Sequence, residues 1–577
     1  MKFLNFSEAN CKNCYKCLRH CPVKAIKIKN GQAKIVEDRC IGCGQCLVVC
    51  PQDARNIKSD LKEVKNAIKE GKKVIASIAP SFAGAFDIND GGQIVTALKK
   101  LGFSAVEETA IGAEIVAKLY KEYIEEKEYE NIITTSCPSA NYLIEKYYPS
   151  LVKYMMPVVS PMVAHGKVIK YNYGMDSYVV FIGPCTAKKI EAANFQHKDI
   201  VNAVLTFEEL SEWFKEENLK INELKPQSFD AEAQKRGKEF PIGGGVLNSF
   251  LDKEINKKYH FISVDGIKES MEIFESLSSG NLKKVCLEVN VCTGSCIGGP
   301  VMPNGELDFF RRLIKVKEYV KGKDNYTEIE NEYKNQIHRL NFTKRFFDKS
   351  LNKNKANEDE IKKILREMGK YEKSDELNCG ACGYNTCREK AQAVYEGMAE
   401  MEMCLPHMRS KAESLNHVIV ENSPNIIILV DRELKIKEFN PTAERIFNVK
   451  ADNIIGKPIS ILIDDTKFNE VKKNKKSILK EKVSYSLYGV VLMQNIIYLE
   501  KQGVILAIMV DITAEEANKK ELIKVKENTL DAAQSVIEKQ MRVAQEIASL
   551  LGETTAETKM ILTKLKKLTM GETGDIK

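Results

Sequence analysis

The distribution of cysteine constrains this chain more than any other feature, because 16 of its 17 cysteines fall into four sets of four. Two sets share the spacing C-x2-C-x2-C-x3-C followed by proline, and each cysteine of the second set lies 29 residues after its counterpart, which indicates an internal duplication. The first set is Cys11, Cys14, Cys17 and Cys21, and the second is Cys40, Cys43, Cys46 and Cys50. This spacing is typical of iron–sulfur ligation and differs from that of zinc sites.

The same two runs resemble those of bacterial ferredoxins that hold two [4Fe-4S] clusters. In such folds the fourth cysteine of each run crosses to the other cluster. The resemblance therefore implies two ligand sets, Cys11, Cys14, Cys17 and Cys50 for one cluster and Cys40, Cys43, Cys46 and Cys21 for the other. Between the runs, residues 25–36 alternate around Asn30-Gly31, which predicts a β-hairpin. Zinc and disulfides are the alternatives at these cysteines.

The bulk composition is that of a soluble globular protein, and the 577 residues suggest about four domains. The net charge is +7, but lysines and acidic residues are interleaved, so we expect no nucleic-acid partner. The first residues lack the apolar segment of a signal peptide, and no apolar run approaches the ~20 residues of a membrane span. Many cysteines without a signal peptide indicate metal sites in the reducing cytoplasm.

The order of strands and helices predicts a multidomain protein of mixed α+β and α/β class. Apolar runs predict buried strands at 74–79 and 178–182, and amphipathic runs predict helices at 112–126 and 207–217. A polar linker is expected from residue 341 to about 360. The predicted parts are a ferredoxin-like module (1–58), a large α/β domain (62–335), a small four-cysteine module (361–412), a mixed domain (416–513) and a helical tail (514–570).

The third set of cysteines belongs to the small module and consists of Cys379, Cys382, Cys387 and Cys404. A helix between Arg388 and Met403 would return Cys404 to the loop of the other three. Gly380 and Gly383 allow the backbone to approach a bulky cluster closely. The module resembles a small four-cysteine iron–sulfur domain of anaerobic redox proteins, and a zinc site is the alternative.

The fourth set is spread over three loops and consists of Cys137, Cys185, Cys292 and Cys296. Each loop places cysteine near proline or glycine at an expected strand end, and four such cysteines favour a cluster over buried structural thiols. These loops, their order and Ala79-Pro80 resemble the [FeFe]-hydrogenase large subunit family over residues 1 to about 305.

That resemblance implies a hydrogenase-like domain in which the four cysteines hold a [4Fe-4S] cluster. Cys296 would also bridge to a two-iron centre that carries CO and cyanide, and Lys188 would donate a hydrogen bond to a cyanide. Pro80 and Ser81 would contact the same cofactor.

The departures from the family concern proton transfer. The family's proton-relay cysteine is replaced by Ser136, and a hydroxyl is a far weaker acid than a thiol. Two family methionines are replaced by Gly183 and Asn290, and Pro300 ends the third loop where the family has glycine. At the family's acidic pair the chain has Val116 and Leu119, or Glu114 at one of the two if the alignment contains a gap. This pattern resembles the sensory members of the family, so we expect low turnover.

Residues 416–513 resemble a PAS domain. Strands are predicted at 425–430, 434–439, 490–498 and 504–510, with a helix from Pro441, and Asn440, Ala443 and Gly456 fit the pattern. The segment lacks cysteine and has only His417 at its edge, so flavin photochemistry and His-ligated haem are disfavoured. We expect it to dimerise or relay a signal.

The tail has apolar positions seven residues apart, which predicts a short parallel coiled coil and a homodimer, with packing on the chain's own PAS domain as the alternative. These positions are Leu522, Thr529, Val536, Val543 and Leu550. No histidine follows His417, so the tail is no phosphoacceptor helix, and a signal would pass to a partner protein. None of the seven histidines is assigned a role, and Cys286 is expected to be a buried, inert thiol.

The sequence thus favours a cytoplasmic iron–sulfur sensor of redox state or H2, with four [4Fe-4S] clusters and a ferredoxin-type electron carrier as partner. Two other hypotheses stay open. One is a working, ferredoxin-linked hydrogenase, and the other is an electron-transfer protein without a two-iron centre.

Overall fold

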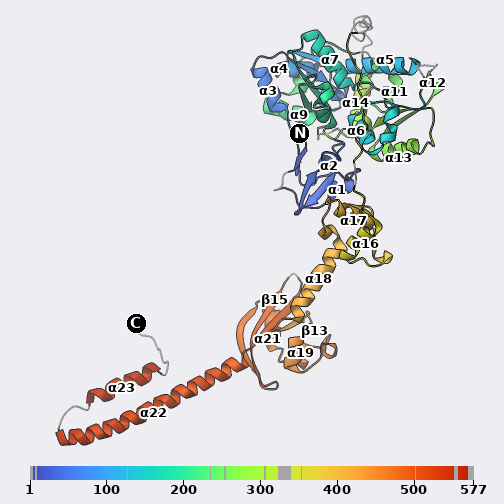
Figure 1. Cartoon of the computed structure of the whole chain (residues 1–577). Coiled ribbons are helices and arrows are strands. Elements are labelled where there is room, and N and C mark those ends of the chain that lie inside the picture. Colours follow the sequence, from blue (N-terminus) through green and yellow to red (C-terminus); the bar gives the residue numbers. More distant parts are fainter. Residues whose placement is uncertain are drawn as a thin grey trace. The chain divides into compact units, whose positions relative to one another are not determined.

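The computed structural model describes residues 4–6, 10–126, 128–233, 235–251, 255–303, 307–322, 339–351, 354–500, 502–551 and 556–569. The chain divides into two compact units, Met1–Met408 and Arg409–Lys577, which are described separately (Figure 1). The predicted multidomain class of mixed α+β and α/β structure is confirmed. The domain ends predicted at residues 335 and 570 lie outside the described residues.

The N-terminal part contains two small antiparallel ladders. Strand β1 (Leu4–Phe6) pairs with β4 (Arg55–Ile57), and β2 (Ile26–Lys29) pairs with β3 (Gln32–Ile35). The turn between β2 and β3 is Asn30-Gly31, with φ of 52° and 67°, as the predicted hairpin requires. Helices α1 (Lys16–His20) and α2 (Gln45–Val48) lie at equivalent places in the two cysteine runs.

Two parallel sheets form the framework of the following part. The larger sheet has the order β6-β5-β8-β9, and the smaller has the order β10-β11-β7. Near-continuous burial of β5, β6, β8, β9 and β11 is typical of parallel strands covered on both faces. The strands are β5 (Val74–Ile78), β6 (Ala105–Glu108), β7 (Ile132–Ile133), β8 (Tyr178–Gly183), β9 (Ala203–Thr206), β10 (His260–Asp265) and β11 (Val285–Asn290).

Helices cover both faces of the larger sheet, so successive residues of each strand face different cores. Ile75 and Ala105 pack with α5 and α7, whereas Ala76 and Val106 pack with α3, α4 and α9. The helices of this part of the chain, including those beside the smaller sheet, are α3 (Leu61–Lys69), α4 (Gly92–Lys100), α5 (Ala110–Glu126), α6 (Pro138–Tyr147), α7 (Pro161–Tyr173), α8 (Ala187–Ala192), α9 (Phe207–Glu216), α10 (Lys235–Lys238), α11 (Gly245–Phe250), α12 (Ile255–Lys258), α13 (Ile267–Ser278) and α14 (Phe309–Lys321).

The segment 341–349, predicted to be a polar linker, instead packs on this framework, and we call it the strap. Phe342 is buried, its carbonyl accepts a hydrogen bond from the Val159 amide, and Thr343 forms an antiparallel bridge with Val158. The linker prediction was wrong here because the lysines of the strap find buried acidic partners. Such partners are invisible in local composition.

The small cysteine module consists of α16 (Glu358–Glu367), α17 (Cys387–Tyr395) and the start of α18 (Leu405–Glu421). Helix α17 ends at Tyr395, well before the predicted Met403. Gly397 has a φ of 65°, which terminates the helix, and a short 3-10 turn at Met401–Met403 then leads to Cys404.

The second unit contains a five-stranded antiparallel sheet of order β13-β12-β16-β15-β14. Asn440 caps α19: its side-chain oxygen accepts from the Ala443 amide, and its amide group donates to the Asn425 carbonyl. The elements are β12 (Ile426–Val430), β13 (Ile436–Phe439), α19 (Pro441–Phe447), α20 (Ala451–Ile454), α21 (Thr466–Asn474), β14 (Ile478–Tyr485), β15 (Val490–Leu499) and β16 (Val504–Asp511).

The tail forms α22 (Thr513–Leu551) and α23 (Ala556–Thr569). The seam residues Leu522, Val536 and Val543 are all more than half exposed rather than packed on the sheet. The coiled coil stays a prediction, because the structure contains one chain. Among the described helices, none has the length and apolar character needed to cross a bilayer.

Candidate metal centre

A cavity lies where the strands of both sheets end. Ligand sites of open parallel sheets lie at this end, because the loops that follow the strands converge there. Each of five strands contributes a wall residue: Pro80 follows β5, Thr109 follows β6, Cys137 follows β7, Cys185 follows β8 and Cys292 follows β11.

All four cysteines of the fourth set line this cavity. Cys185 and Cys137 interact electrostatically with both Cys292 and Cys296, so the three distant loops meet at one place. Burial raises the pKa of Cys185 to about 11 and that of Cys296 to about 12. The free thiols therefore hold their protons, and binding a metal as thiolates would release them.

The wall residues fit a polar, metal-containing group. Ser81 is fully buried at the cavity wall, and within the described residues its hydroxyl has no hydrogen-bond partner. No three histidine, cysteine or acidic side chains of the described residues come close enough together to bind a single metal ion. Cysteines spaced around this volume suit a multi-atom cluster better than one tetrahedral ion.

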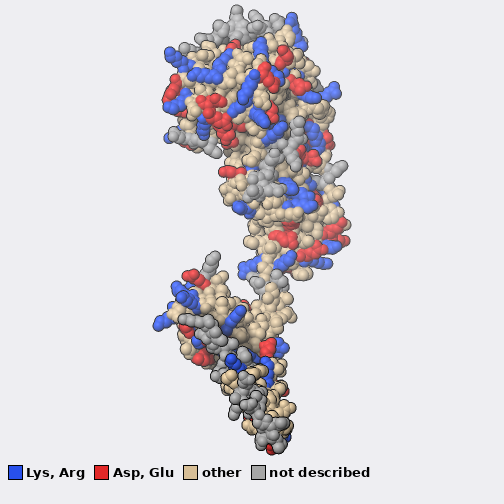
Figure 2. All heavy atoms as spheres, turned by 90° about the vertical axis from the view of Figure 1, so that its left-hand side faces the viewer, with Lys and Arg blue, Asp and Glu red and all other residues tan. Residues whose placement is uncertain are grey.

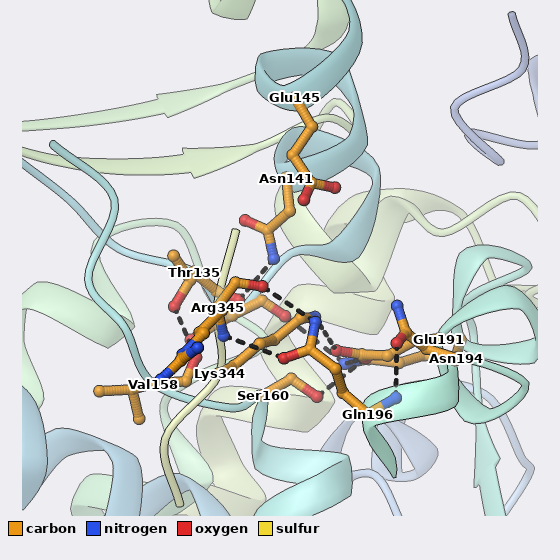
Figure 3. Close-up of polar contacts among 12 residues, drawn as sticks. Thr135, Asn141, Glu145, Val158, Ser160, Glu191, Asn194, Gln196, Lys344 and Arg345 are labelled. Carbon is orange, nitrogen blue, oxygen red and sulfur yellow. Dashed lines mark hydrogen bonds and ion pairs between the residues drawn. The ribbon is translucent and has the colours of Figure 1, made fainter. Parts of the chain in front are cut away.

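Lys188, also a wall residue, is held by a buried carboxylate. Its ammonium donates to Glu191 at 2.7 Å. Ser160 donates to the same oxygen at 2.9 Å, and Lys344 of the strap donates to the other oxygen at 3.2 Å (Figure 3). Burial alone would raise the pKa of Glu191, but the two lysines and these hydrogen bonds lower it to about 2. The ammonium of Lys188 is thus fixed at the cavity wall, and the strap contributes to this through the bond of Lys344 to Glu191.

The hydrogen bonds of the Ser136 hydroxyl lead through two other hydroxyls to backbone carbonyls, and these contacts include no carboxyl group. The Ser136 hydroxyl lies 3.4 Å from the Tyr120 hydroxyl, which contacts Thr135 at 3.1 Å. Thr135 then donates to the backbone carbonyls of Met156 and Val158, which have no proton to give. Of the residues at the expected acidic pair, Val116 packs in the apolar core and Leu119 against it, and Glu114 packs against the wall residue Gly237.

In the N-terminal part, three cysteines of the first predicted group lie close together, and so do all four of the second. Cys17 interacts with Cys11 and Cys14, and Cys43 interacts with Cys21, Cys40 and Cys46. The Ala25 amide donates to the sulfur of Cys21 at 3.2 Å, and the Ala54 amide donates to that of Cys50 at 3.4 Å, which repeats one contact in both halves. Iron binding by these cysteines stays a prediction.

The N-terminal part docks beside the cavity. Thr186 donates to the Gly42 carbonyl at 2.5 Å, and Cys43 interacts electrostatically with Cys292. A Cβ on Gly44 would lie 2.5 Å from Pro300, so the proline that departs from the family pattern forms part of this contact. The N-terminal cysteines around Cys43 therefore lie close to the cavity cysteines around Cys292.

The third set also gathers around one space. Its four cysteines line a small hollow, together with Lys390, whose pKa is lowered to about 8 by burial. The module docks on the N-terminal part: Lys24 donates to the Gly383 carbonyl at 2.7 Å and interacts with both Cys21 and Cys382. The remaining cysteine, Cys286, is fully buried in β11, as expected of a structural thiol.

Four segments match known families. Residues 3–62 match the 4Fe-4S dicluster domain, and residues 72–300 match the C-terminal domain of the iron-only hydrogenase large subunit. Residues 375–406 match an Fe–S cluster family, and residues 415–488 match the PAS fold. The chain therefore carries a hydrogenase-like domain together with iron–sulfur domains and a PAS domain.

Among individual proteins, iron hydrogenase 1 of Clostridium pasteurianum is 28% identical over 52% of this chain and 65% of that protein, just under two thirds of its length. The periplasmic [Fe] hydrogenase large subunit of Nitratidesulfovibrio vulgaris is 29% identical over 52% of this chain and 87% of that protein. A cytosolic Fe-S cluster assembly factor of Xenopus tropicalis is 23% identical over 41% of this chain and 64% of that protein.

We expect Glu191→Gln to destabilise the metal-free protein by about 3–5 kcal/mol, because Lys188 and Lys344 would stay buried without an anion. Chemical unfolding followed by the fluorescence of Trp213, the only tryptophan, measures the change. The folded pKa of Glu191 lies below its usual 4.5, so the loss should be complete above about pH 4.5 and shrink as pH falls toward 2.

The matched control is Glu122→Gln, which breaks an exposed pair with Lys118 in the same domain and should cost less than about 0.5 kcal/mol. Equal effects of the two substitutions would contradict the role given to Glu191.

Proposed function

We propose that the protein is an iron–sulfur sensor of redox state or H2 whose hydrogenase-like cavity receives the signal. The observation that carries this proposal is a hydrogenase-like cysteine shell with a fixed cation, combined with a Ser136 hydrogen-bond chain that ends in backbone carbonyls. Turnover of H2 needs protons to enter and leave repeatedly, whereas sensing needs only a change of state.

In this proposal, Cys137, Cys185, Cys292 and Cys296 hold a [4Fe-4S] cluster, and Cys296 is shared with a two-iron centre. When bound, such a group supplies one-electron redox chemistry and binds H2. The protein's own residues fix its place: Lys188 offers an ammonium, Ser81 offers an unpaired hydroxyl and Pro80 shapes the wall. The N-terminal cysteines and the Cys379 module hold three further clusters.

The signal would leave through the PAS domain to a downstream protein, with α22 as the dimer contact. A ferredoxin-type carrier would exchange electrons with the N-terminal clusters. We place the protein in the cytoplasm, because sixteen thiols in metal-ligand patterns suit a reducing compartment.

Two other functions have specific support. Similarity to two hydrogenases supports a working hydrogenase. Similarity to an Fe-S cluster assembly factor supports an iron–sulfur protein without the two-iron centre. Infrared spectroscopy after co-expression with hydrogenase maturation enzymes separates them, because CO and cyanide bands appear only if the two-iron centre is present.

We expect the loaded protein to evolve H2 slowly with a reduced dye, and Ser136→Cys to raise the rate at least about tenfold, because a positioned acid or base contributes ~10²–10⁴. The control is Ser270→Cys, which adds a thiol at a buried serine of α13 and should not change the rate. Fast evolution by the unchanged protein, with no gain in the variant, favours the working hydrogenase.

We expect about 16 iron atoms per chain in anaerobic protein whose four sets carry [4Fe-4S] clusters, before any two-iron centre is added. Cys387→Ser should remove about four of them and leave the infrared bands unchanged. Cys286→Ser is the matched control and should remove none, because this thiol is buried in β11. Zinc in place of iron would contradict the proposal.

We expect the full chain to be a dimer and Val536→Asp to make it a monomer, because a charge in an apolar seam opposes association. Gln534→Asp, on an exposed position two residues away, should leave the dimer intact. Sedimentation analysis measures both, and a monomeric wild type would contradict the coiled coil.

A further inference from the structure

A chain of buried polar side chains runs behind the cavity wall and plays no part in the cysteine shell. The ring of His165 lies 3.0 Å from the Glu107 carboxylate through Nε2 and 2.8 Å from the Ser77 hydroxyl through Nδ1. The Ser77 hydroxyl lies 2.7 Å from that of Thr109. Exposure is 0% for His165, 1% for Ser77, 2% for Glu107 and 5% for Thr109, so the chain is closed to solvent.

The register of the sheet places these groups together. Ser77 of β5 and Glu107 of β6 are direct partners in the parallel pair, and both belong to the face that α5 and α7 cover. His165 lies on α7, which can reach the sheet because Gly112 of α5 has no side chain. A Cβ on Gly112 would lie 2.2 Å from the Pro161 carbonyl and 2.7 Å from the His165 amide.

One end of the chain is a cavity wall. Thr109 lines the cavity, and so do Ala113 of α5 and Met162 of α7. The other end is a carboxyl group that pairs with an imidazole. Each hydroxyl in between can accept one proton and donate another, so the chain can pass a proton along without moving heavy atoms. The Ser136 chain, by contrast, ends in carbonyl oxygens.

We propose that the Glu107–His165 pair is a store for one proton that serves the cavity. This inference rests on the proposed function, because it needs a group in the cavity that becomes more basic when it is reduced. On reduction, the Glu107 carboxyl gives its proton to His165 Nε2, and His165 Nδ1 gives its proton to Ser77. Ser77 then gives its proton to Thr109, and Thr109 gives its own to a basic atom of the bound iron–sulfur group.

The step moves one proton and no electron within the chain, and it leaves Glu107 as a carboxylate and His165 neutral. The proton leaves when added negative charge in the cavity attracts it. Oxidation reverses each transfer and returns the proton to Glu107. Since the pair is closed to solvent, the store supplies one proton for each change of state.

The test is the infrared difference spectrum between the oxidised and reduced forms of the loaded, full-length protein. We expect reduction to bleach the C=O band of a protonated carboxyl group and to add carboxylate bands. In Glu107→Gln this band should be absent. In His165→Phe it should be present but unchanged by reduction, because the route to Ser77 is cut. If His165→Phe does not fold, Ser77→Ala, which removes a single oxygen, should show the same loss.

The matched control is Glu108→Gln. Glu108 is the next residue of β6, its pKa is raised to about 7 by burial, and it pairs with Lys238 at 3.3 Å on the opposite face of the sheet. Its removal should leave the reduction-linked change intact.

Electron paramagnetic resonance shows whether the cavity cluster is reduced. If it is reduced but no carboxyl band changes in a way that depends on Glu107, the proton store alone is overturned. Protein with no reducible group in the cavity would overturn the proposed function, and the store with it.

Discussion

The carboxyl ends of the parallel strands of two sheets open onto one cavity, and the proposals about its bound group depend on that constraint. The strands are buried on both faces, and the loops that follow parallel strands converge at one edge of the sheet. Residues far apart in sequence therefore meet at that edge. Cys137, Cys185 and Cys292 share no local pattern, and only the topology brings them together. The same geometry delivers Thr109 and Ser81 to the wall.

The charged side chains beside this site are buried. Lys188, Glu191 and Lys344 form a buried group of two cations and one anion, and such a group is tolerated only when hydrogen bonds satisfy its members. The strap that supplies Lys344 leads in sequence to the Cys379 module. A change in the ion pair between Lys188 and Glu191 would therefore alter the contact of Lys344, and with it the strap, which precedes the Cys379 module in sequence.

The surface carries no equivalent concentration of charge on the face shown in Figure 2, where Lys and Arg side chains are interspersed with Asp and Glu. This matches the interleaving in sequence.

Spacing alone indicated the two repeated cysteine runs, whereas the fourth set was grouped by its Gly/Pro-rich loops and their resemblance to a known family. The hairpin at Asn30-Gly31 and the strand at 178–182 follow local rules. What failed depends on distant partners. The strap was read as a linker, since nothing near Lys344 reveals Glu191. No histidine was given a role, because the pairing of His165 with Glu107 depends on the sheet and on the close approach at Gly112. The sequence signals for this pairing were weak: His165 on one apolar helix and Gly112 on another.

The two polar chains at the cavity differ in what they can do, and the difference separates a sensor from a turnover enzyme. The chain from Ser136 reaches acceptors that cannot supply a proton, and the chain from Thr109 reaches one carboxyl group that is shut off from solvent. An enzyme must renew its protons at every cycle, so a closed store would be exhausted after one step. A sensor that is reduced once and oxidised once needs no renewal, because the proton returns along the same hydrogen bonds. On this argument, the replacement of the relay cysteine by Ser136 and the burial of Glu107 and His165 favour the same function.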